Sequence, residues 1–378
     1  LVILRWLLFV MPIIVLFYYE NGLSQTKIMI LQSVFSIGVV IFEIPSGYFS
    51  DVIGRKRTIV IGSVISTLAF GIYSLSSGFW EFLIAELVLG LGASFISGTD
   101  SAMIYDSLIE TGRAGEYAKI EGRRTSAANF SETAAAIAGG LLATVSLRFP
   151  FYVEFFVMAL TIPLSMTLVE PERHKFDNSQ GSVKGILSIV RFALHEHSEV
   201  KWLIIYSSII GSSTLTMVWF IQPYLDVVGL PVAYFGVAWA ALNFSVGVFS
   251  ILAYRIERSL GQSRTLLMLL PLAVLGYVLS GYIQSPWVIA PFFIFYFVRG
   301  IHGPMLKEYV NRLISSDKRA TVLSVKNMMG RLVFTVIGPF VGWMKDIYSF
   351  RTAFLFAACL FFLAGSLSIL FLRKHRLV

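Results

Sequence analysis

The chain has 378 residues, of which 56% are apolar and 14% charged, and its net charge is +8. A soluble chain carries about 25% charged residues because it needs a solvated surface, so this composition excludes a soluble multidomain protein. A membrane-spanning helix uses about 20 residues, and twelve such helices would leave room only for connections and ends. The composition therefore predicts a polytopic membrane protein.

Apolar runs separated by short polar breaks predict the helices. Every backbone amide in hydrocarbon needs a partner within the protein, so runs of this length form helices, and the period-two pattern of a barrel is absent. We expect an all-α protein with twelve transmembrane helices at residues 1–19, 27–49, 58–77, 79–110, 117–147, 149–169, 201–224, 231–254, 265–283, 286–312, 321–345 and 350–372.

The start of the chain and its single cysteine give little information about processing or cellular compartment. Leu1 lies inside an apolar run without a methionine, so we expect a few residues to precede it; this run is typical of a first span rather than of a cleavable signal. Cys359 lies in an apolar segment and has no second cysteine to pair with, so cysteine usage does not indicate the compartment.

The positions of lysine and arginine predict the orientation. Nineteen of them lie in the even-numbered connections, the middle segment and the C-terminal tail, and four lie in the odd-numbered connections. Because cytoplasmic loops are enriched in these residues, we expect a multi-pass protein of the plasma (inner) membrane with both termini in the cytoplasm. This topology also explains the basic charge, and no nucleic-acid partner is expected.

The longest polar connection divides the chain. We expect an N-terminal six-helix bundle at 1–169, a cytoplasmic linker at 170–200 and a C-terminal six-helix bundle with a short tail at 201–378. Residues 183–194 have apolar residues at helical spacing, which predicts a short interfacial helix. His195 and His197 have no cysteine or second cluster beside them, so this pair favours a solvated linker, and neither a metal nor a cofactor is predicted.

Two short matches suggest that the halves are related. Gly54 and Gly261 begin similar stretches after the second and eighth spans, at an offset of 207 residues, and Tyr105 and Tyr309 lie near the ends of the fourth and tenth spans at an offset of 204. Transporters with a central binding site between two repeats show such symmetry. The matches predict two pseudo-symmetric six-helix bundles.

One motif carries a family resemblance. Residues 47–57 read GYFSDVIGRKR in the first cytoplasmic connection. This resembles the G-x-x-x-D-[RK]-x-G-[RK]-[RK] signature of the major facilitator superfamily, although Val52 replaces the usual basic residue. Gly54 permits a tight turn and Gly47 permits close helix approach. Basic residues are expected at a cytoplasmic turn in any case, but the acid and both glycines at this spacing are not.

The resemblance implies that the motif's acid, Asp51, docks against the start of helix eleven near Thr321 and closes the cytoplasmic side, since a helix N-terminus attracts an anion. It also implies that an acid at the end of helix four, Asp106, joins this network and that the gate does not contact substrate. The implied gating residues are Gly47, Asp51, Gly54, Arg55, Lys56, Arg57 and Asp106.

Other signatures of the family are altered. Where many proton-coupled members carry R-x-x-Q-G-x-G in helix four, this chain has an acid, Glu86, so that motif does not predict proton coupling here. Antiporters of the family often show G-x-x-x-G-P-x-x-G-G in helix five. Residues 131–140 keep the small residues of this motif but lack its proline, and Gly338–Gly342 in helix eleven partly repeats the motif. Small residues at this spacing also serve plain helix packing.

Ionisable residues inside the bilayer cost about 2.5–3.5 kcal/mol each and need a partner or a function. Depth along the helix four and five hairpin places Asp106 level with Arg123 and Arg124, and Asp100 a turn deeper within reach of an arginine. These charges either hold the hairpin together or separate and re-form during transport.

Glu132 lies deeper, with no basic residue at its level on the hairpin. Because burial disfavours the charged form of a carboxyl, we expect Glu132 to be the proton site, with Glu43 and Glu154 as weaker alternatives. Glu86 is expected to lie too near the outer half of helix four to be desolvated.

Helices one, four, seven and ten line the central cavity in the family. Arg299 and His302 share a face of helix ten, where they either bind an anionic group and titrate, or make structural contacts with helix seven or eleven. The resemblance implies a cavity lined by Tyr18, Tyr19, Ser97, Thr214, Trp219, Gln222, Arg299 and His302.

We expect a secondary active transporter that works by alternating access and exports small, amphiphilic, drug-like molecules in a proton-coupled antiport. Its partners are then a small-molecule substrate, protons and the lipid bilayer, and we expect a monomer. A proton-linked importer or exchanger of an anionic metabolite is an alternative, as is a sensor or binding protein that no longer transports. No catalytic triad, metal cluster or nucleotide loop is present in the sequence, so an enzyme is not predicted.

Overall fold

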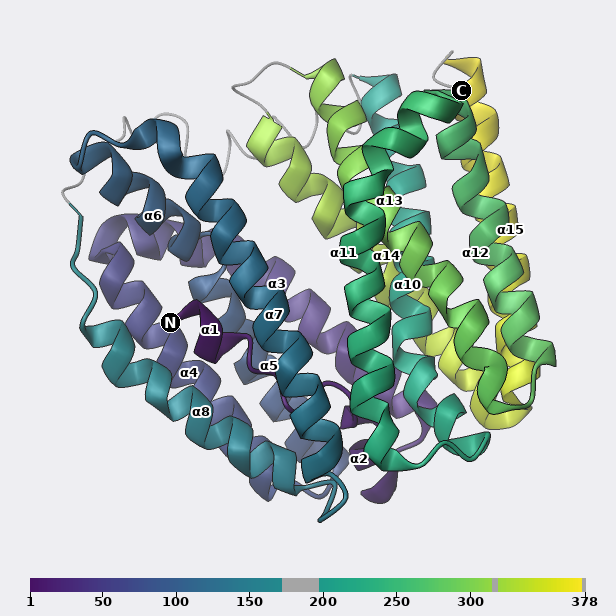
Figure 1. The fold of residues 1–378 in the computed structure, drawn as a ribbon, viewed down its shortest axis with the longest axis horizontal. Coiled ribbons are helices and arrows are strands. Elements are labelled where there is room, and N and C mark those ends of the chain that lie inside the picture. The colour runs from purple at the N-terminus through teal and green to yellow at the C-terminus, as the bar shows by residue number, and fades with distance from the viewer. Residues whose placement is uncertain (172–196, 315–318, 376–378) are drawn as a thin grey trace. The chain divides into compact units, whose positions relative to one another are not determined.

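The computed structural model describes residues 1–171, 197–314 and 319–375. Within these ranges the protein is all-helical (Figure 1). Its α-helices are α1 (Val2–Arg5), α2 (Ile14–Glu20), α3 (Gln25–Ile53), α4 (Arg55–Leu75), α5 (Phe79–Ile96), α6 (Thr99–Glu110), α7 (Tyr117–Leu142), α8 (Phe149–Met166), α10 (Ser198–Val227), α11 (Phe235–Leu260), α12 (Gln262–Tyr282), α13 (Ile289–Leu313), α14 (Arg319–Ile347) and α15 (Phe350–Lys374).

The helices follow the predicted spans closely. In the described part of the chain, ten of the predicted spans correspond to one helix each, from α3 to α15. Nine helical stretches there are long and apolar enough to cross a membrane by length and composition. The interfacial helix predicted at 183–194 and the neighbouring His195 lie outside the described residues.

Two predicted spans are interrupted. The first span is divided into α1 and α2 by the non-helical residues 6–13, which include Pro12. Proline has no N–H to donate and disfavours a continuing helix. The fourth span is divided into α5 and α6 at Gly98, whose φ of 78° lies in the left-handed region that glycine adopts readily.

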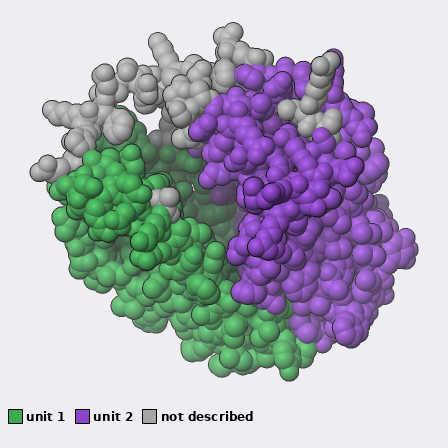
Figure 2. All heavy atoms as spheres, turned by 45° about the horizontal axis from the view of Figure 1, so that its top comes forward, with its two compact units in different colours: residues 1–23, 34–177, 231–240 green, residues 24–33, 178–230, 241–378 purple. Residues whose placement is uncertain are grey.

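The chain forms two compact units, which Figure 2 shows in green and purple. Unit 1 contains Leu1–Leu23, Val34–Asp177 and Pro231–Ala240, and unit 2 contains Ser24–Ser33, Asn178–Leu230 and Ala241–Val378. The first turns of α3 therefore belong to unit 2, and the segment that leads into α11 belongs to unit 1. The predicted bundles at 1–169 and 201–378 stay a prediction.

Each unit packs around a few central helices. In unit 1, α4 packs against α5 and α8, and α1 packs against α7 and α8. In unit 2, α10 packs against α13, α14 and α15, and α12 packs against α15, as Figure 1 also shows. The buried core of unit 2 includes Tyr206, Leu269, Ile301 and Leu306. These contacts bury the apolar stripes of the helices within each unit.

The same aromatic cluster occurs in both units. Its members lie at offsets of 203 or 204 residues: Phe17, Tyr73 and Phe151 in unit 1, and Phe220, Tyr277 and Phe354 in unit 2. The ring centroids of Phe17 and Tyr73 lie 4.2 Å and 5.7 Å from that of Phe151. The corresponding distances to Phe354 are 5.8 Å and 6.3 Å. The two halves thus build equivalent cores from residues at equivalent positions.

The two glycines of the predicted repeat also occupy equivalent places. Gly54 joins α3 to α4 with a φ of 112°, and Gly261 joins α11 to α12 with a φ of 81°. A residue with a β-carbon is strained in this region. The tight turn predicted at Gly54 is confirmed, and its counterpart repeats 207 residues later.

Candidate functional site

Arg55 is the centre of the motif at the α3–α4 turn. Its guanidinium makes an ion pair of 2.6 Å with Asp51, one turn earlier, and another of 3.3 Å with Asp106 on α6. The Arg55 side chain is only 17% exposed, whereas that of Asp51 is 64% exposed. Arg55 therefore connects α3, α4 and α6, and Asp106 is one of its partners, whereas the gating role of these residues stays a prediction.

Glu170 contributes a contact that the sequence analysis did not predict. Its Oε1 accepts a hydrogen bond of 2.7 Å from the Arg55 backbone N–H, and its Oε2 accepts one of 2.8 Å from that of Lys56. The first N–H groups of a helix lack intrahelical partners and carry a partial positive charge. Glu170 thus caps α4 and fixes the turn that holds the motif. An acid directly before Pro171, at the end of the sixth span, is the sequence signal that points to it.

The other motif residues differ in their surroundings. A β-carbon built at Gly47 meets no described atom within 4 Å, and the close helix approach expected at Gly47 stays a prediction. Lys56 is half-buried and Arg57 is exposed. Asp51 belongs to unit 1 and Thr321 to unit 2. The expected docking of Asp51 near Thr321 therefore stays a prediction.

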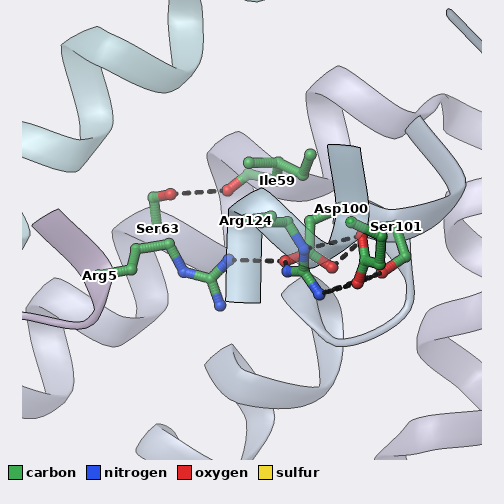
Figure 3. Close-up of polar contacts among 7 residues, drawn as sticks. Arg5, Ile59, Ser63, Asp100, Ser101 and Arg124 are labelled. Atoms are coloured by element: carbon green, nitrogen blue, oxygen red, sulfur yellow. Dashed lines mark hydrogen bonds and ion pairs between the residues drawn. The ribbon is translucent and has the colours of Figure 1, made fainter. Parts of the chain in front are cut away.

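A second ion-pair network lies around Asp100 (Figure 3). Its Oδ2 is 2.6 Å from Nη1 of Arg124 on α7 and 3.3 Å from Nη1 of Arg5 on α1. Arg124 also pairs with Glu121 on its own helix. Three helices of unit 1 therefore meet at one carboxylate. An arginine near Asp100 was expected from the sequence, whereas the contact with Arg5 was not.

The expected partnership of Asp106 with Arg123 and Arg124 is wrong. Asp106 pairs with Arg55, Arg124 pairs with Asp100, and Arg123 is exposed. The depth estimate treated the fourth span as one straight helix. The break at Gly98 lets α6 start a new helix, so depth along the hairpin does not determine which side chains meet.

Glu86 lies in a buried polar cluster in unit 1. The Tyr18 hydroxyl donates to Glu86 Oε1 over 3.0 Å, and the Tyr18 and Tyr73 hydroxyl oxygens are also 3.0 Å apart. Glu86 is 2% exposed, so the expectation that it escapes desolvation is wrong. Tyrosines of α2 and α4 cover it, and Tyr18 itself is fully buried in this cluster.

Glu154 on α8 is the second fully buried acid in the described part of the chain. Its Oε2 accepts a hydrogen bond of 2.7 Å from the backbone N–H of Phe9, in the break between α1 and α2. Its Oε1 has no hydrogen-bond partner among the described residues. The other predicted acids are less buried, because Glu132 is half-buried on α7 and Glu43 is exposed on α3. The proton role predicted for these two stays a prediction.

Small residues of α7 permit very close backbone contacts in unit 1. A β-carbon at Gly139 would lie 2.0 Å from the carbonyl oxygen of Phe9, and one at Gly236 would lie 2.1 Å from that of Ala136. Neither position has space for a side chain. The small-residue stretch of helix five thus brings α7 against the break in the first span and against the start of α11.

The residues predicted to line a central cavity have different environments. Ser97 and Arg299 are exposed, and Tyr19 and His302 are half-buried. His302 Nε2 lies 3.0 Å from Ser207 Oγ and 2.9 Å from the Ser207 carbonyl oxygen, which is a contact with helix seven, α10. On α10, the residues Thr214, Trp219 and Gln222 are buried. The cavity itself stays a prediction.

Comparison with known proteins gives the family. The model of the Major Facilitator Superfamily matches residues 2–337. The chain is 22% identical to the uncharacterized MFS-type transporter YxaM of Bacillus subtilis (strain 168), over 92% of this chain and 88% of that protein. It is 25% identical to the multidrug resistance protein MdtG of Dickeya zeae (strain Ech586), over 97% of this chain and 90% of that protein.

A solved structure shows the same fold. A point mutant of the nucleoside transporter NupG superimposes with a TM-score of 0.83 at 14% identity and covers 98% of both chains. The helical architecture, the repeated core and the motif at the α3–α4 turn agree with this likeness. The chain is a multi-pass integral membrane protein and belongs to the major facilitator superfamily of transporters.

Proposed function

We propose that this transporter exports small amphiphilic organic molecules in exchange for protons, by alternating access of a central site to the two sides of the inner membrane. Both termini then lie in the cytoplasm, as the distribution of lysine and arginine predicts. Transport of this kind uses an ion gradient rather than a nucleotide, and the protein works as a monomer.

The observation that carries this proposal is the contact surface of α7. Gly139 and Gly140 let α7 approach the first span and the start of α11 so closely that backbone touches backbone. The small residues of this stretch resemble the helix-five motif of antiporters, and they place α7 directly against the break in the first span. The similarity to MdtG, named as a multidrug resistance protein, supports the same class of substrate.

Buried acids support the proton part of the proposal. Glu86 and Glu154 are both fully enclosed in unit 1, at 2% and 0% exposure. An ionisable group at such a place is costly and marks an ion or proton pathway in many membrane proteins. The second unit has no fully buried Asp or Glu among its described residues. Because the fully buried acids of the described ranges lie in unit 1 alone, we assign them a role in coupling proton movement to transport rather than in general packing.

One observation favours a second candidate function. Arg299 is exposed on α13, a helix that lines the cavity in the family, and an exposed guanidinium there suits an anionic substrate. An importer or exchanger of an anionic metabolite is therefore the alternative, and the structural likeness to a nucleoside transporter is compatible with uptake.

The purified protein distinguishes these functions in two steps. Thermal-shift measurements with amphiphilic cations and with small organic anions test which class stabilises the fold, since a ligand that binds only the native state raises its stability. Counterflow of the stabilising compound in proteoliposomes then tests for transport. The proposal predicts stabilisation and counterflow with amphiphilic compounds. Anion-specific stabilisation supports the alternative, and binding without counterflow indicates a sensor.

A further inference from the structure

The carboxyl of Glu154 lies where the first span is interrupted. Residues 6–13 are non-helical between α1 and α2, yet Val10 and Ile13 are 2% and 0% exposed. Backbone N–H groups at such a break lose their helical acceptors, and unsatisfied groups are costly away from water. Glu154 Oε2 supplies the shorter of two acceptors to the N–H of Phe9, at 2.7 Å, and the carbonyl oxygen of Leu7 is the other, at 3.2 Å. The acid is thus a structural part of the break.

The two oxygens of this carboxyl differ: Oε2 accepts a hydrogen bond from the Phe9 N–H, and the backbone N–H of Val10 also interacts with the carboxyl group. Glu154 is 0% exposed, and Oε1 has no hydrogen-bond partner in the described ranges. None of the ion pairs between described residues includes Glu154. A buried carboxylate with an unpaired oxygen is strongly disfavoured. A proton on Oε1 removes the charge and leaves the Phe9 contact in place.

The titratable groups on the elements packed against α8 have other partners. Arg5 of α1 and Arg124 of α7 both pair with Asp100, and Tyr73 of α4 bonds to Tyr18. Arg148, at the start of α8 itself, donates to the carbonyls of Ser74 and Ser76 and to the side chain of Asn21. The remaining charged groups on α4 and α7 are Arg55, Lys56, Arg57, Lys119, Glu121, Arg123 and Glu132. Arg5 and Arg124 therefore pair with another acid, and the described hydrogen bonds of Arg148 go to neutral oxygens rather than to Glu154.

The internal repeat shows that the acid and the break occur together in only one half of the chain. At the offset of 203 that relates the aromatic cores, Glu154 corresponds to Ala357, which is also 0% exposed. The break at Phe9 corresponds to Ser212 in the middle of α10, which continues unbroken from Ser198 to Val227. Unit 2 thus builds the equivalent core with neither the acid nor the break. Both features are specific to the first half of the chain.

We propose that Glu154 is the proton-binding group that couples proton movement to rearrangement of the broken first span. The proton binds at Oε1 and leaves from the same atom, with no other bond changed. When the proton leaves, the carboxylate holds the N–H groups of the break more tightly, because charge-assisted hydrogen bonds are stronger than neutral ones. Protonation therefore loosens the hold of α8 on the first span. This inference rests on the proposed proton exchange and names its site.

The test compares Glu154→Gln with Glu86→Gln. Glutamine keeps a carbonyl oxygen for the Phe9 N–H but does not bind a proton, so E154Q is expected to fold. Infrared difference spectra of the purified proteins between acid and alkaline pH report protonated carboxylic acids directly. The wild type and E86Q are expected to show a buried carboxylic-acid C=O band that E154Q lacks. An unchanged band in E154Q overturns the assignment, as does a band in the wild type that responds to sodium rather than to pH.

Transport measurements separate this inference from the proposed function. In proteoliposomes, E154Q is expected to retain substrate counterflow while its flux driven by a pH gradient falls to the level of empty liposomes. Gradient-driven flux that persists in E154Q contradicts the inference even if the protein is a proton-coupled exporter. If the wild type itself shows no gradient-driven flux, the proposed proton exchange fails, and the infrared band still decides whether Glu154 binds a proton.

Discussion

Asp346, in the last turn of α14, caps the first turn of α3 at Thr26. Its Oδ2 accepts hydrogen bonds from the Thr26 N–H at 2.7 Å and from the Thr26 hydroxyl at 2.6 Å, and its Oδ1 accepts one from the Gln25 N–H at 3.1 Å. All three residues belong to unit 2. The start of α3 is thus anchored to the end of α14 by two residues, Thr26 and Asp346, that are 320 positions apart in the sequence.

Replacing this cap is expected to weaken the fold. Asp346→Ala removes the acceptor of two orphan N–H groups at a helix start, and loss of such a cap costs about 1 kcal/mol. Unfolding in mixed micelles with increasing denaturant measures the free energy of unfolding. Ile347→Ala, at the neighbouring exposed position, is the control. Equal stability of the two variants would show that the cap does not contribute.

Asp51 is expected to act on the rate of transport rather than on binding. Asp51→Asn keeps the side-chain shape but weakens the ion pair with Arg55, which is 2.6 Å long. The expected result is slow counterflow with a nearly unchanged affinity in equilibrium ligand binding. Arg57→Gln, which alters an exposed charge of the same motif, is the matched control. A proportional loss of binding and flux in D51N contradicts a gating role.

The contact between α7 and the first span leaves no room for a methyl group. Gly139→Ala places a β-carbon 2.0 Å from the carbonyl oxygen of Phe9, and overpacking of this kind costs about 1–3 kcal/mol. We expect a lower yield of folded protein and impaired counterflow. Gly38→Ala on α3 adds the same group where no described atom lies within 4 Å. A wild-type phenotype for G139A would mean that the helices separate without cost.

The predicted orientation is testable by labelling introduced cysteines. In a Cys359→Ala background, Arg57→Cys and Ser77→Cys place thiols at exposed positions at opposite ends of α4. A membrane-impermeant maleimide applied to intact cells is expected to label the cysteine at 77, whereas the one at 57 reacts only after permeabilisation. The reverse pattern would invert the topology.

The sequence predicted the helices well because hydropathy follows the requirement for about 20 apolar residues per span. It did not predict the break at residues 6–13, since hydropathy does not report where a backbone N–H finds its acceptor. The shorter hydrogen bond of the Phe9 N–H is to Glu154, which lies 145 residues away in the chain. The break at Gly98 was missed for a related reason, because a single glycine inside an apolar run does not by itself interrupt a helix.

The site was only partly predictable. The motif at the α3–α4 turn was found because its spacing is local, and the ion pair of Asp51 with Arg55 follows from one helical turn. The capping acid Glu170 and the partners of Asp100 depend on how distant helices pack, which residue spacing does not reveal. Depth along a hairpin places residues at one level but does not determine which side chains face each other.

The most direct test of the account is flux driven by an imposed pH gradient. Purified wild-type protein in proteoliposomes is given an amphiphilic cationic dye, with the lumen more acidic than the outside, and dye accumulation is followed by fluorescence. The account predicts that dye accumulates in the acidic lumen as protons leave, and that a protonophore abolishes the accumulation. Equal dye movement with and without the gradient would contradict proton-coupled export.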